Sequence, residues 1–257
     1  MKEEIFVYLI GTAGSGKSTL TRNFKDWMNL KGLDAITVNL DPGADNLPYE
    51  PDVDIRDWIS LEDVMKEYKL GPNGAQIACA DMLALNTADV KESIESYKSD
   101  YVIMDTPGQL ELFVFREAGK YIVKFFKPEK SIIGFLLDPS LAKKPTGFAS
   151  QLLLSLSTNL RLNNPQLNIL TKSDMLKDDE VDSIVRWSYE PDELLNAISS
   201  ENADMYREMS EKLAYLMEGF GNISRLIPTG LDEKMGIDDI YTNIQMIFKG
   251  GEDLTSD

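Results

Sequence analysis

The stretch that decides the fold reads Gly11-Thr12-Ala13-Gly14-Ser15-Gly16-Lys17-Ser18-Thr19. It follows an apolar run, residues 5–10, and opens onto a helix-like stretch from Thr19 to Leu30. This sequence matches every position of the phosphate-loop pattern. Glycines let backbone N–H groups turn toward a di- or triphosphate, and the following helix presents its positive end to the same anion. We therefore expect residues 12–19 to bind a nucleoside triphosphate, with Lys17 on the outer phosphates and Ser18 on Mg²⁺.

Length and charge narrow the class of protein. The chain has 257 residues, 43% of them hydrophobic, which suits one core with an elaboration. Its formal net charge is −17. An acidic surface repels phosphate backbones and anionic membranes, so neither nucleic acid nor a membrane is expected as the main partner.

Absent residue types exclude several chemistries. The sequence contains no histidine, which excludes Ser-His-Asp and Cys-His catalysis and histidine metal sites. Its single cysteine, Cys79, forms no intramolecular disulfide and suits a reducing compartment. No run approaches the roughly 18 apolar residues that cross a bilayer. We expect a cytoplasmic protein.

Strand-like runs recur along the chain and are separated by helical patterns. After residues 5–10 they are Ala35–Leu40, Tyr101–Met104, Ser131–Leu137, Leu167–Leu170 and a weaker Arg225–Ile227. Short runs that are apolar on both faces are typical of buried parallel strands. The pattern predicts an α/β fold, a doubly wound, mostly parallel sheet of the P-loop NTPase type with helical insertions. We expect one domain over residues 1–250, inserts at about residues 45–97 and 178–219, and a disordered tail at 251–257.

Two strands are followed by residues suited to hydrolysis. Asp41 follows the second strand, where a γ-phosphate and metal would lie, although an Asp-Pro-Gly turn that caps its own backbone is the alternative. The third strand is followed by Asp105-Thr106-Pro107-Gly108-Gln109. Asp105 matches the Walker B carboxylate that holds Mg²⁺, and Gly108 is placed to sense the γ-phosphate. Gln109 is placed to orient the attacking water.

The last two strands are followed by residues suited to a base. Thr171-Lys172-Ser173-Asp174 is similar to the Asn-Lys-x-Asp guanine motif, with Thr in place of Asn. Asp174 would accept hydrogen bonds from the guanine N1–H and amine, and Lys172 would cover the purine plane. An acidic turn is the alternative. Thr229 and Gly230 follow the sixth strand, where a backbone contact to the guanine O6 is usual.

One more short motif completes a family resemblance. Gly71-Pro72-Asn73-Gly74 by itself predicts only a turn that ends a helix. Together with the motifs above, however, the chain resembles the GPN-loop GTPases, dimeric phosphate-loop GTPases of archaea and eukaryotes, over nearly its whole length. The resemblance implies a homodimer of archaeal type with facing nucleotide sites, in which Asn73 reaches the partner's phosphates.

The resemblance also implies roles for individual residues. It places Asp41, Gln109 and Glu111 around the attacking water, while Ser18 and Asp105 serve Mg²⁺. Related dimeric NTPases of the MinD type carry a lysine at the second loop position, where this chain has Thr12, so no lysine finger comes from that position. Thr171 in place of Asn alters one contact that steadies the phosphate loop.

Three functions follow from these motifs. The first is a dimeric switch that hydrolyses GTP, with a role in assembling protein complexes by analogy with eukaryotic relatives. The second is a small-molecule kinase, which would need an arginine-rich lid, whereas residues 45–97 contain only Arg56. The third is a nucleotide-gated assembly factor with a protein client, in which hydrolysis is incidental.

Overall fold

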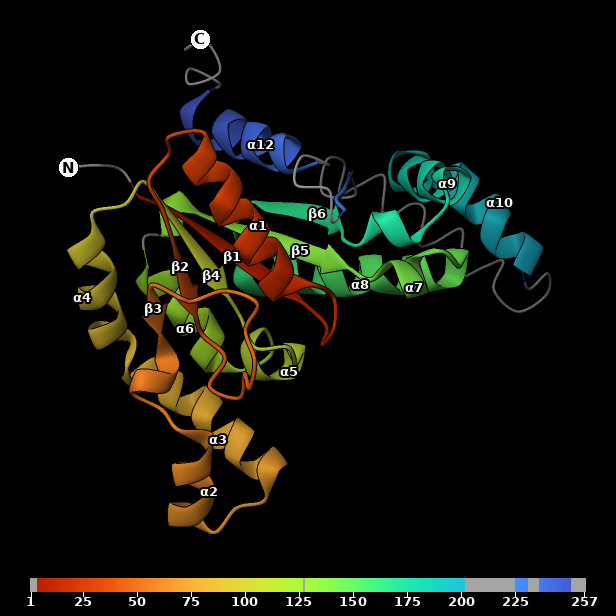
Figure 1. The fold of residues 1–257 in the computed structure, drawn as a ribbon. Coiled ribbons are helices and arrows are strands. Elements are labelled where there is room, and N and C mark those ends of the chain that lie inside the picture. The colour runs from red at the N-terminus through yellow and green to blue at the C-terminus, as the bar shows by residue number, and fades with distance from the viewer. Residues whose placement is uncertain (1–3, 127, 202–224, 231–235, 251–257) are drawn as a thin grey trace. The chain divides into compact units, whose positions relative to one another are not determined.

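The computed structural model describes residues 4–126, 128–201, 225–230 and 236–250. The chain divides into two compact units: Met1–Gly134 with Arg161–Pro165, and Phe135–Leu160 with Gln166–Asp257. Figure 1 shows helices flanking a sheet whose strand order is β3-β2-β4-β1-β5-β6-β7. The pairs β1–β4, β2–β4, β2–β3 and β6–β7 are parallel. The predicted α/β fold of the P-loop NTPase type is confirmed.

The strands are short and mostly buried. They are β1 Ile5–Gly11, β2 Ala35–Asn39, β3 Val53–Asp54, β4 Tyr101–Asp105, β5 Ser131–Leu137, β6 Gln166–Leu170 and β7 Leu226–Pro228. Every residue of β1, β2, β4 and β5 is buried. Covering both faces of a parallel sheet with helices explains why these strands are apolar without alternation.

Helices make up most of the remaining described chain. The α-helices are α1 Lys17–Leu30, α2 Leu61–Tyr68, α3 Pro72–Leu85, α4 Thr87–Tyr97, α5 Leu110–Phe113, α6 Glu117–Phe125, α7 Pro139–Ala142, α8 Pro145–Leu162, α9 Asp178–Tyr189, α10 Pro191–Glu201 and α12 Ile237–Lys249. Three single turns of 3₁₀ helix are η1 Ile55–Asp57, η2 Pro128–Lys130 and η3 Ser173–Met175. None of the helices in the described ranges is both long and apolar enough to span a membrane.

In the first unit, α1 packs against β1, β2 and β4 with Leu20, Phe24 and Met28 buried. Consecutive members of this set are four residues apart, so they lie on one face of the helix. The register aligns Leu9 of β1 and Asn39 of β2 with Asp105 of β4. The carboxyl ends of three neighbouring strands therefore meet at one edge, which is where ligands bind on such sheets.

The insert between β2 and β4 differs from the expectation in two ways. It is mostly helical, as expected, but it also contains β3, a two-residue strand parallel to β2. The Gly-Pro-Asn tripeptide is not a turn that only ends a helix. Helix α2 ends at Tyr68, and Gly71 is the N-cap of α3, with Pro72 in its first turn. Proline is favoured there because the first N–H groups of a helix have no partner within it. Figure 1 shows α2 and α3 packed together beyond β3.

In the second unit, β6 and β7 are neighbours, and α9 packs on both α10 and β7. Phe148 of α8 contacts Trp187 of α9 through their rings, with centroids 6.1 Å apart. The predicted helical insert at 178–219 is present as α9 and α10 up to Glu201, and its remaining residues lie outside the described ranges. The predicted tail at 251–257 lies outside them as well.

Candidate functional site

The loop between β1 and α1 has the backbone geometry of a phosphate cradle. Gly14 and Gly16 have φ angles of +76° and +93°, a conformation that residues with a Cβ rarely adopt. Gly16 is the N-cap of α1 and makes no side-chain cap, so the free N–H groups of the first turn face the loop. Thr12 closes the loop by accepting a 3.1 Å hydrogen bond from the Ser15 N–H. The arrangement suits an anion.

Lys17 is folded back onto this loop. Its Nζ donates to the carbonyl oxygens of Gly11 and Thr12, at 2.9 and 3.0 Å. The residue is only 6% exposed, and burial lowers the pKa of its ammonium group while Asp105 and Asp41 partly restore it. The ammonium thus lies among groups that hold it beside the phosphate cradle.

Asp105 ends strand β4, which lies between β2 and β1, and is 2% exposed. Burial raises the pKa of its carboxyl group, while hydrogen bonds from Ser18 and Tyr49 and the charge of Lys17 act to lower it. A buried carboxylate is costly unless it is paired with a positive charge. The hydroxyl of Ser18 and the carboxylate of Asp105 are hard oxygen ligands of the kind Mg²⁺ prefers, so these residues fit a magnesium site completed by phosphates and water.

Gly108 lies against the phosphate loop. A Cβ placed on Gly108 would be 3.4 Å from Ala13 Cα and 3.8 Å from Lys17 Nζ. The Gly108 backbone is thus next to the ammonium group that would hold the outer phosphates. The predicted contact between Gly108 and the terminal phosphate stays a prediction.

Gln109 and Glu111 are both exposed. Gln109 is the N-cap of the short helix α5, and Glu111 lies in its first turn. Gln109 does not cap the helix with its side chain. Instead its Nε2 donates a 2.8 Å hydrogen bond to Oε1 of Gln76, in the first turns of α3.

Asp41 has a partner within its own turn. Its Oδ1 accepts a 2.9 Å hydrogen bond from the Gly43 N–H, and its own N–H donates to Asn39 Oδ1. The turn-capping alternative considered from the sequence is therefore present in this structure. It leaves the second carboxylate oxygen of Asp41 available, and the charge of Asp41 still acts on Lys17.

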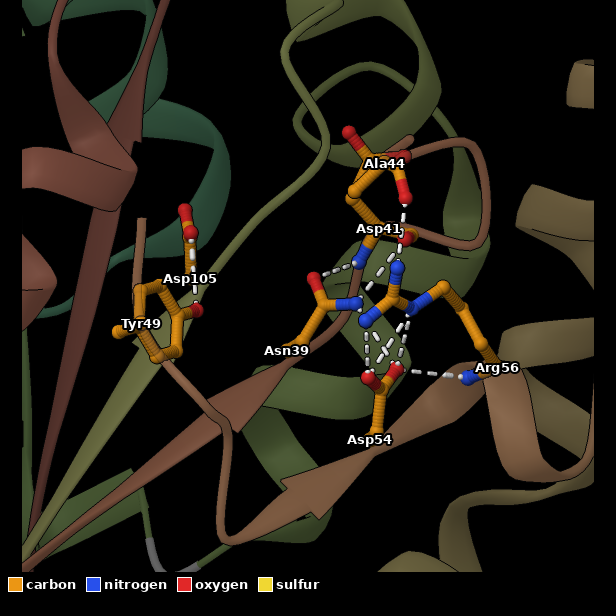
Figure 2. Close-up of polar contacts among 7 residues, drawn as sticks. All are labelled: Asn39, Asp41, Ala44, Tyr49, Asp54, Arg56 and Asp105. Atoms are coloured by element: carbon orange, nitrogen blue, oxygen red, sulfur yellow. Dashed lines mark hydrogen bonds and ion pairs between the residues drawn. The ribbon is translucent and has the colours of Figure 1, made fainter. Parts of the chain in front are cut away.

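A polar network supports the segment after β2 (Figure 2). Asn39 donates to Asp41 O and to Asp54 Oδ1, at 3.2 and 2.9 Å. Arg56 forms a two-pronged ion pair with Asp54 and also donates to Ala44 O at 2.8 Å. Burial would raise the pKa of Asp54, but the hydrogen bonds from Arg56 and Asn39 outweigh it and hold the pKa below its usual value. This network fixes the loop that carries Asp41 to β3.

Tyr49 is a site residue that motif reading missed. Its hydroxyl donates a 3.0 Å hydrogen bond to Asp105 Oδ2, as Figure 2 shows. Burial and the neighbouring Asp105 raise the pKa of Tyr49, so the phenol keeps its proton. Tyr49 lies in a loop whose sequence shows no periodic pattern, and nothing in the spacing points to the Asp105 carboxylate, 56 residues away.

Asn73 is exposed in the first turn of α3. Its predicted role toward the phosphates of a partner subunit stays a prediction.

The second unit carries the base motif. Lys172 adopts a left-handed backbone conformation with φ of +50°, and Asp174 is exposed in η3. Ser173 ties this turn to the end of β7 by donating its N–H and hydroxyl to Thr229 O, at 2.9 and 2.7 Å. Thr229 N–H in turn donates to Leu170 O at 2.7 Å. The segments after β6 and β7, which carry the residues predicted to bind the nucleotide base, are thus hydrogen-bonded to each other within this unit. Gly230 is next to Thr229 in the second of these segments.

The Thr171 side chain explains part of the departure from the guanine motif. Its hydroxyl donates to Leu137 O at 3.1 Å, joining the ends of β5 and β6. Threonine here therefore contacts the neighbouring strand of its own unit.

Comparison with known proteins agrees with these motifs. The model of a family described as conserved hypothetical ATP binding protein matches residues 9–250. GPN-loop GTPase 3 of Eremothecium gossypii is 33% identical over 252 residues, covering 96% of this chain and 92% of that protein. GPN-loop GTPase 3 of Saccharomyces cerevisiae is 31% identical, covering 96% of this chain and 93% of that protein. The chain belongs to the GPN-loop GTPase family.

A solved structure supports the same assignment for this GPN-loop GTPase family member. The crystal structure of a GTPase from Pyrococcus abyssi in its apo form superposes with a TM-score of 0.84 and 30% sequence identity. The match covers 95% of this chain and 98% of the other. The tripeptide after which GPN-loop GTPases are named is Gly71-Pro72-Asn73, and the structure places it at the start of α3.

Proposed function

We propose that this GPN-loop GTPase is a homodimeric molecular switch that binds GTP with Mg²⁺ and hydrolyses it to GDP and phosphate. Family membership supports the hydrolase activity. The observation that carries the proposal is the close grouping of Lys17, Asp105 and Gly108 at the carboxyl ends of β1 and β4. Phosphoryl transfer needs positive charge and backbone donors at such a position more than it needs covalent chemistry.

The phosphate loop and Lys17 would bind the phosphate oxygens of GTP. On GTP binding, Lys17 exchanges the carbonyl oxygens of Gly11 and Thr12 for phosphate oxygens, which are charged and therefore stronger acceptors. Mg²⁺ held by Ser18 and Asp105 would neutralise charge that develops on the β- and γ-phosphate oxygens.

Gln109 and Asp41 would position the attacking water, and Glu111 is close to Gln109 in the sequence. As the water oxygen bonds to the γ-phosphorus, the bond to the β–γ bridging oxygen breaks, and GDP and phosphate are released together with the proton that the water gives up. Gln109 would orient this water with its carbonyl oxygen, because its amide nitrogen is already engaged by Gln76. Asp41 would accept a hydrogen bond from the water through the oxygen that does not cap Gly43.

We assign the base as guanine. The matching family model is described as ATP binding, whereas the curated relatives are named GTPases. Asp174 supports guanine, because a carboxylate can accept from the N1–H and amine of guanine, and adenine offers it no such pair of donors. Lys172 would cover the ring with its aliphatic stem.

The Gly-Pro-Asn loop would complete the site of a second copy. Asn73 is exposed in the first turn of α3, and Thr12 rules out a lysine finger from the second loop position. We therefore assign Asn73 to the phosphates of the partner subunit. The switch would act on a protein client, since the loops with Asp41 and Gln109 sense whether a γ-phosphate is present.

Mixing two inactive variants tests the dimer and Asn73 together. Asn73→Ala and Lys17→Ala should each abolish or strongly slow hydrolysis on their own. If Asn73 acts across the interface, a mixed dimer has one intact site, with Lys17 from one subunit and Asn73 from the other. Random mixing should then restore about a quarter of the wild-type rate, because about half the dimers are mixed and each has one good site.

The same mixture distinguishes the alternatives. If Asn73 acts within its own subunit, both sites of a mixed dimer are defective and no activity returns. Light scattering on the purified protein gives the mass directly, and a monomer with wild-type activity would contradict the proposal.

A further inference from the structure

We propose that Gln76 is a positioning residue that holds Gln109 for hydrolysis and links it to the Gly-Pro-Asn loop. The inference rests on the proposed role of Gln109 as the residue that orients water. It assigns a function to a side chain that belongs to none of the recognised motifs.

The contact is a hydrogen bond between two amide side chains. Gln109 Nε2 donates to Gln76 Oε1 at 2.8 Å. Gln109 is exposed, and a glutamine side chain has three rotatable bonds whose ordering costs free energy. A fixed partner for its nitrogen reduces that cost and leaves its carbonyl oxygen to accept a hydrogen bond from water.

Gln76 also lies beside the loop that carries Asp41. A Cβ placed on Gly43 would be 3.6 Å from Gln76 Nε2 and 3.4 Å from Asp41 Oδ1. One side chain of α3 is therefore next to both segments that are proposed to hold the attacking water. Neither segment is adjacent to Gln76 in sequence, so only the fold brings the three together.

Gln76 is three residues after Asn73 in the same helix, and residues with this spacing share a helix face. The buried side of α3 lies next to this face, since Ala75, Cys79 and Leu83 are buried and the helix packs against α5 and α6. A helix moves as a rigid element over one turn. Whatever Asn73 binds therefore acts on a helix that ends its first turn at Gln76, in contact with Gln109.

A second polar contact of α3 provides a matched control. Asp81 forms a two-pronged ion pair with Arg116, with distances of 2.8 and 2.6 Å, and Arg116 follows α5. Asp81→Asn weakens the attachment of α3 to the segment after Gln109 without touching the amide pair. Gln76→Met removes the hydrogen bond and keeps the length and helix propensity of the side chain.

The experiment measures single-turnover GTP hydrolysis and the GTP dissociation constant for the full-length protein. Four variants are compared with wild type: Gln76→Met, Gln109→Ala, the combination of both, and Asp81→Asn. We expect Gln76→Met to slow hydrolysis about 3- to 10-fold, the effect of losing one neutral hydrogen bond in the transition state. Its GTP dissociation constant should stay within about twofold of wild type. For Asp81→Asn, the hydrolysis rate and the GTP dissociation constant should both stay within about twofold of wild type.

The combined variant separates positioning from general loosening. If Gln76 acts through Gln109, adding Gln76→Met to Gln109→Ala causes no further loss of rate. A Gln76→Met protein as fast as wild type overturns the inference, and so does an equal loss in both backgrounds. If Gln109→Ala itself hydrolyses GTP at the wild-type rate, the proposed function of Gln109 fails and the inference fails with it. If Gln109→Ala hydrolyses GTP slowly but Gln76→Met hydrolyses it at the wild-type rate, the inference about Gln76 is overturned and the proposed function of Gln109 stands.

Discussion

Asp41 shows how one carboxylate can serve two purposes. Its Oδ1 caps the Gly43 N–H, which is the ordinary use of Asp in an Asp-Pro-Gly turn. Its charge nevertheless acts on Lys17 at the phosphate cradle. A cap needs only an acceptor oxygen, whereas activating water also needs the negative charge, so a substitution can separate the two uses.

Asp41→Asn keeps the acceptor and removes the charge. We expect the free energy of unfolding to change by less than about 0.5 kcal/mol, because the turn keeps its cap. Single-turnover hydrolysis should fall about 100-fold, the lower end of the range for losing a group that activates water. Asp41→Ala, which removes both, should be equally slow and less stable. If Asp41→Asn hydrolyses GTP at the wild-type rate, Asp41 does not activate water and serves only to cap its turn.

The proposed recognition of guanine by Asp174 can also be tested with a single substitution. Asp174→Asn turns an acceptor into a group that also donates, and xanthine offers an extra carbonyl in place of the guanine amine. We expect the preference for GTP over XTP to reverse, with GTP binding weakened by about 1 to 3 kcal/mol through loss of its paired hydrogen bonds. Competition of both nucleotides against a fluorescent analogue measures the ratio. Asp174→Glu, which keeps the charge, should still prefer GTP, and an Asp174→Asn protein that does so too would place the base elsewhere.

Residues inside familiar motifs could be predicted from the sequence, and their partners could not. Lys17, Ser18 and Asp105 come together as expected because strand ends of a parallel sheet meet at one edge. Tyr49 and Gln76 reach the same region from an irregular loop and an inserted helix. Their contacts depend on how long segments fold back, which neither spacing nor hydrophobic period encodes.

At the scale of elements, Gly71-Pro72-Asn73 shows that one signal can mark two structures. Proline followed by a small polar residue favours a turn, and it equally favours the first turn of a helix. The structure has both a helix end at Tyr68 and a helix start at Pro72, only a few residues apart. Strand β3 escaped prediction for another reason: two residues are too few to show a period of two.

Two glycines in helices predict opposite effects of the same substitution. A Cβ on Gly119 of α6 would lie 1.8 Å from Phe113 O, so Gly119→Ala must push α5 and α6 apart. We expect a loss of about 1 to 3 kcal/mol in unfolding free energy. In α3, the three atoms nearest to a Cβ on Gly74 would all belong to the Leu70 side chain, at 3.5 Å and beyond.

Gly74→Ala is therefore the matched control. Its better helix propensity should raise the unfolding free energy by up to about 1 kcal/mol. Urea unfolding followed by circular dichroism measures both variants under one set of conditions. A Gly119→Ala protein as stable as Gly74→Ala would contradict the close approach of α6 to the end of α5.

At the scale of the whole molecule, the chain divides its chemistry between two units. The first carries the phosphate loop, Asp105 and the Gly-Pro-Asn loop, and the second carries Lys172, Asp174 and Thr229. The alternation of strand and helix patterns predicted this fold because β1, β2, β4 and β5 are buried on both faces. The division into units was not predicted, since a strand that is shared between them has no distinguishing composition.

Nucleotide binding should stabilise the whole protein. A ligand at about 100 times its dissociation constant adds about 2.7 kcal/mol to the native state, which corresponds to a rise of roughly 5 to 10 °C in Tm for a chain of this size. Differential scanning calorimetry with GDP and Mg²⁺ should show this rise, and chelation of Mg²⁺ should reduce it. Asp105→Asn should show a smaller difference between the two conditions, because Asn binds Mg²⁺ more weakly. Equal Tm values with and without Mg²⁺ in the wild type would argue against the assigned metal ligands.

The inward position of Lys17 has a kinetic consequence. The ammonium group is held on two loop carbonyls, so Lys17 and the loop stabilise each other's position. An incoming nucleotide therefore exchanges one set of acceptors for another and does not wait for a loop to order. Association should be limited by diffusion, while the lifetime of the bound state, set by the charged contacts made after that exchange, should determine the affinity.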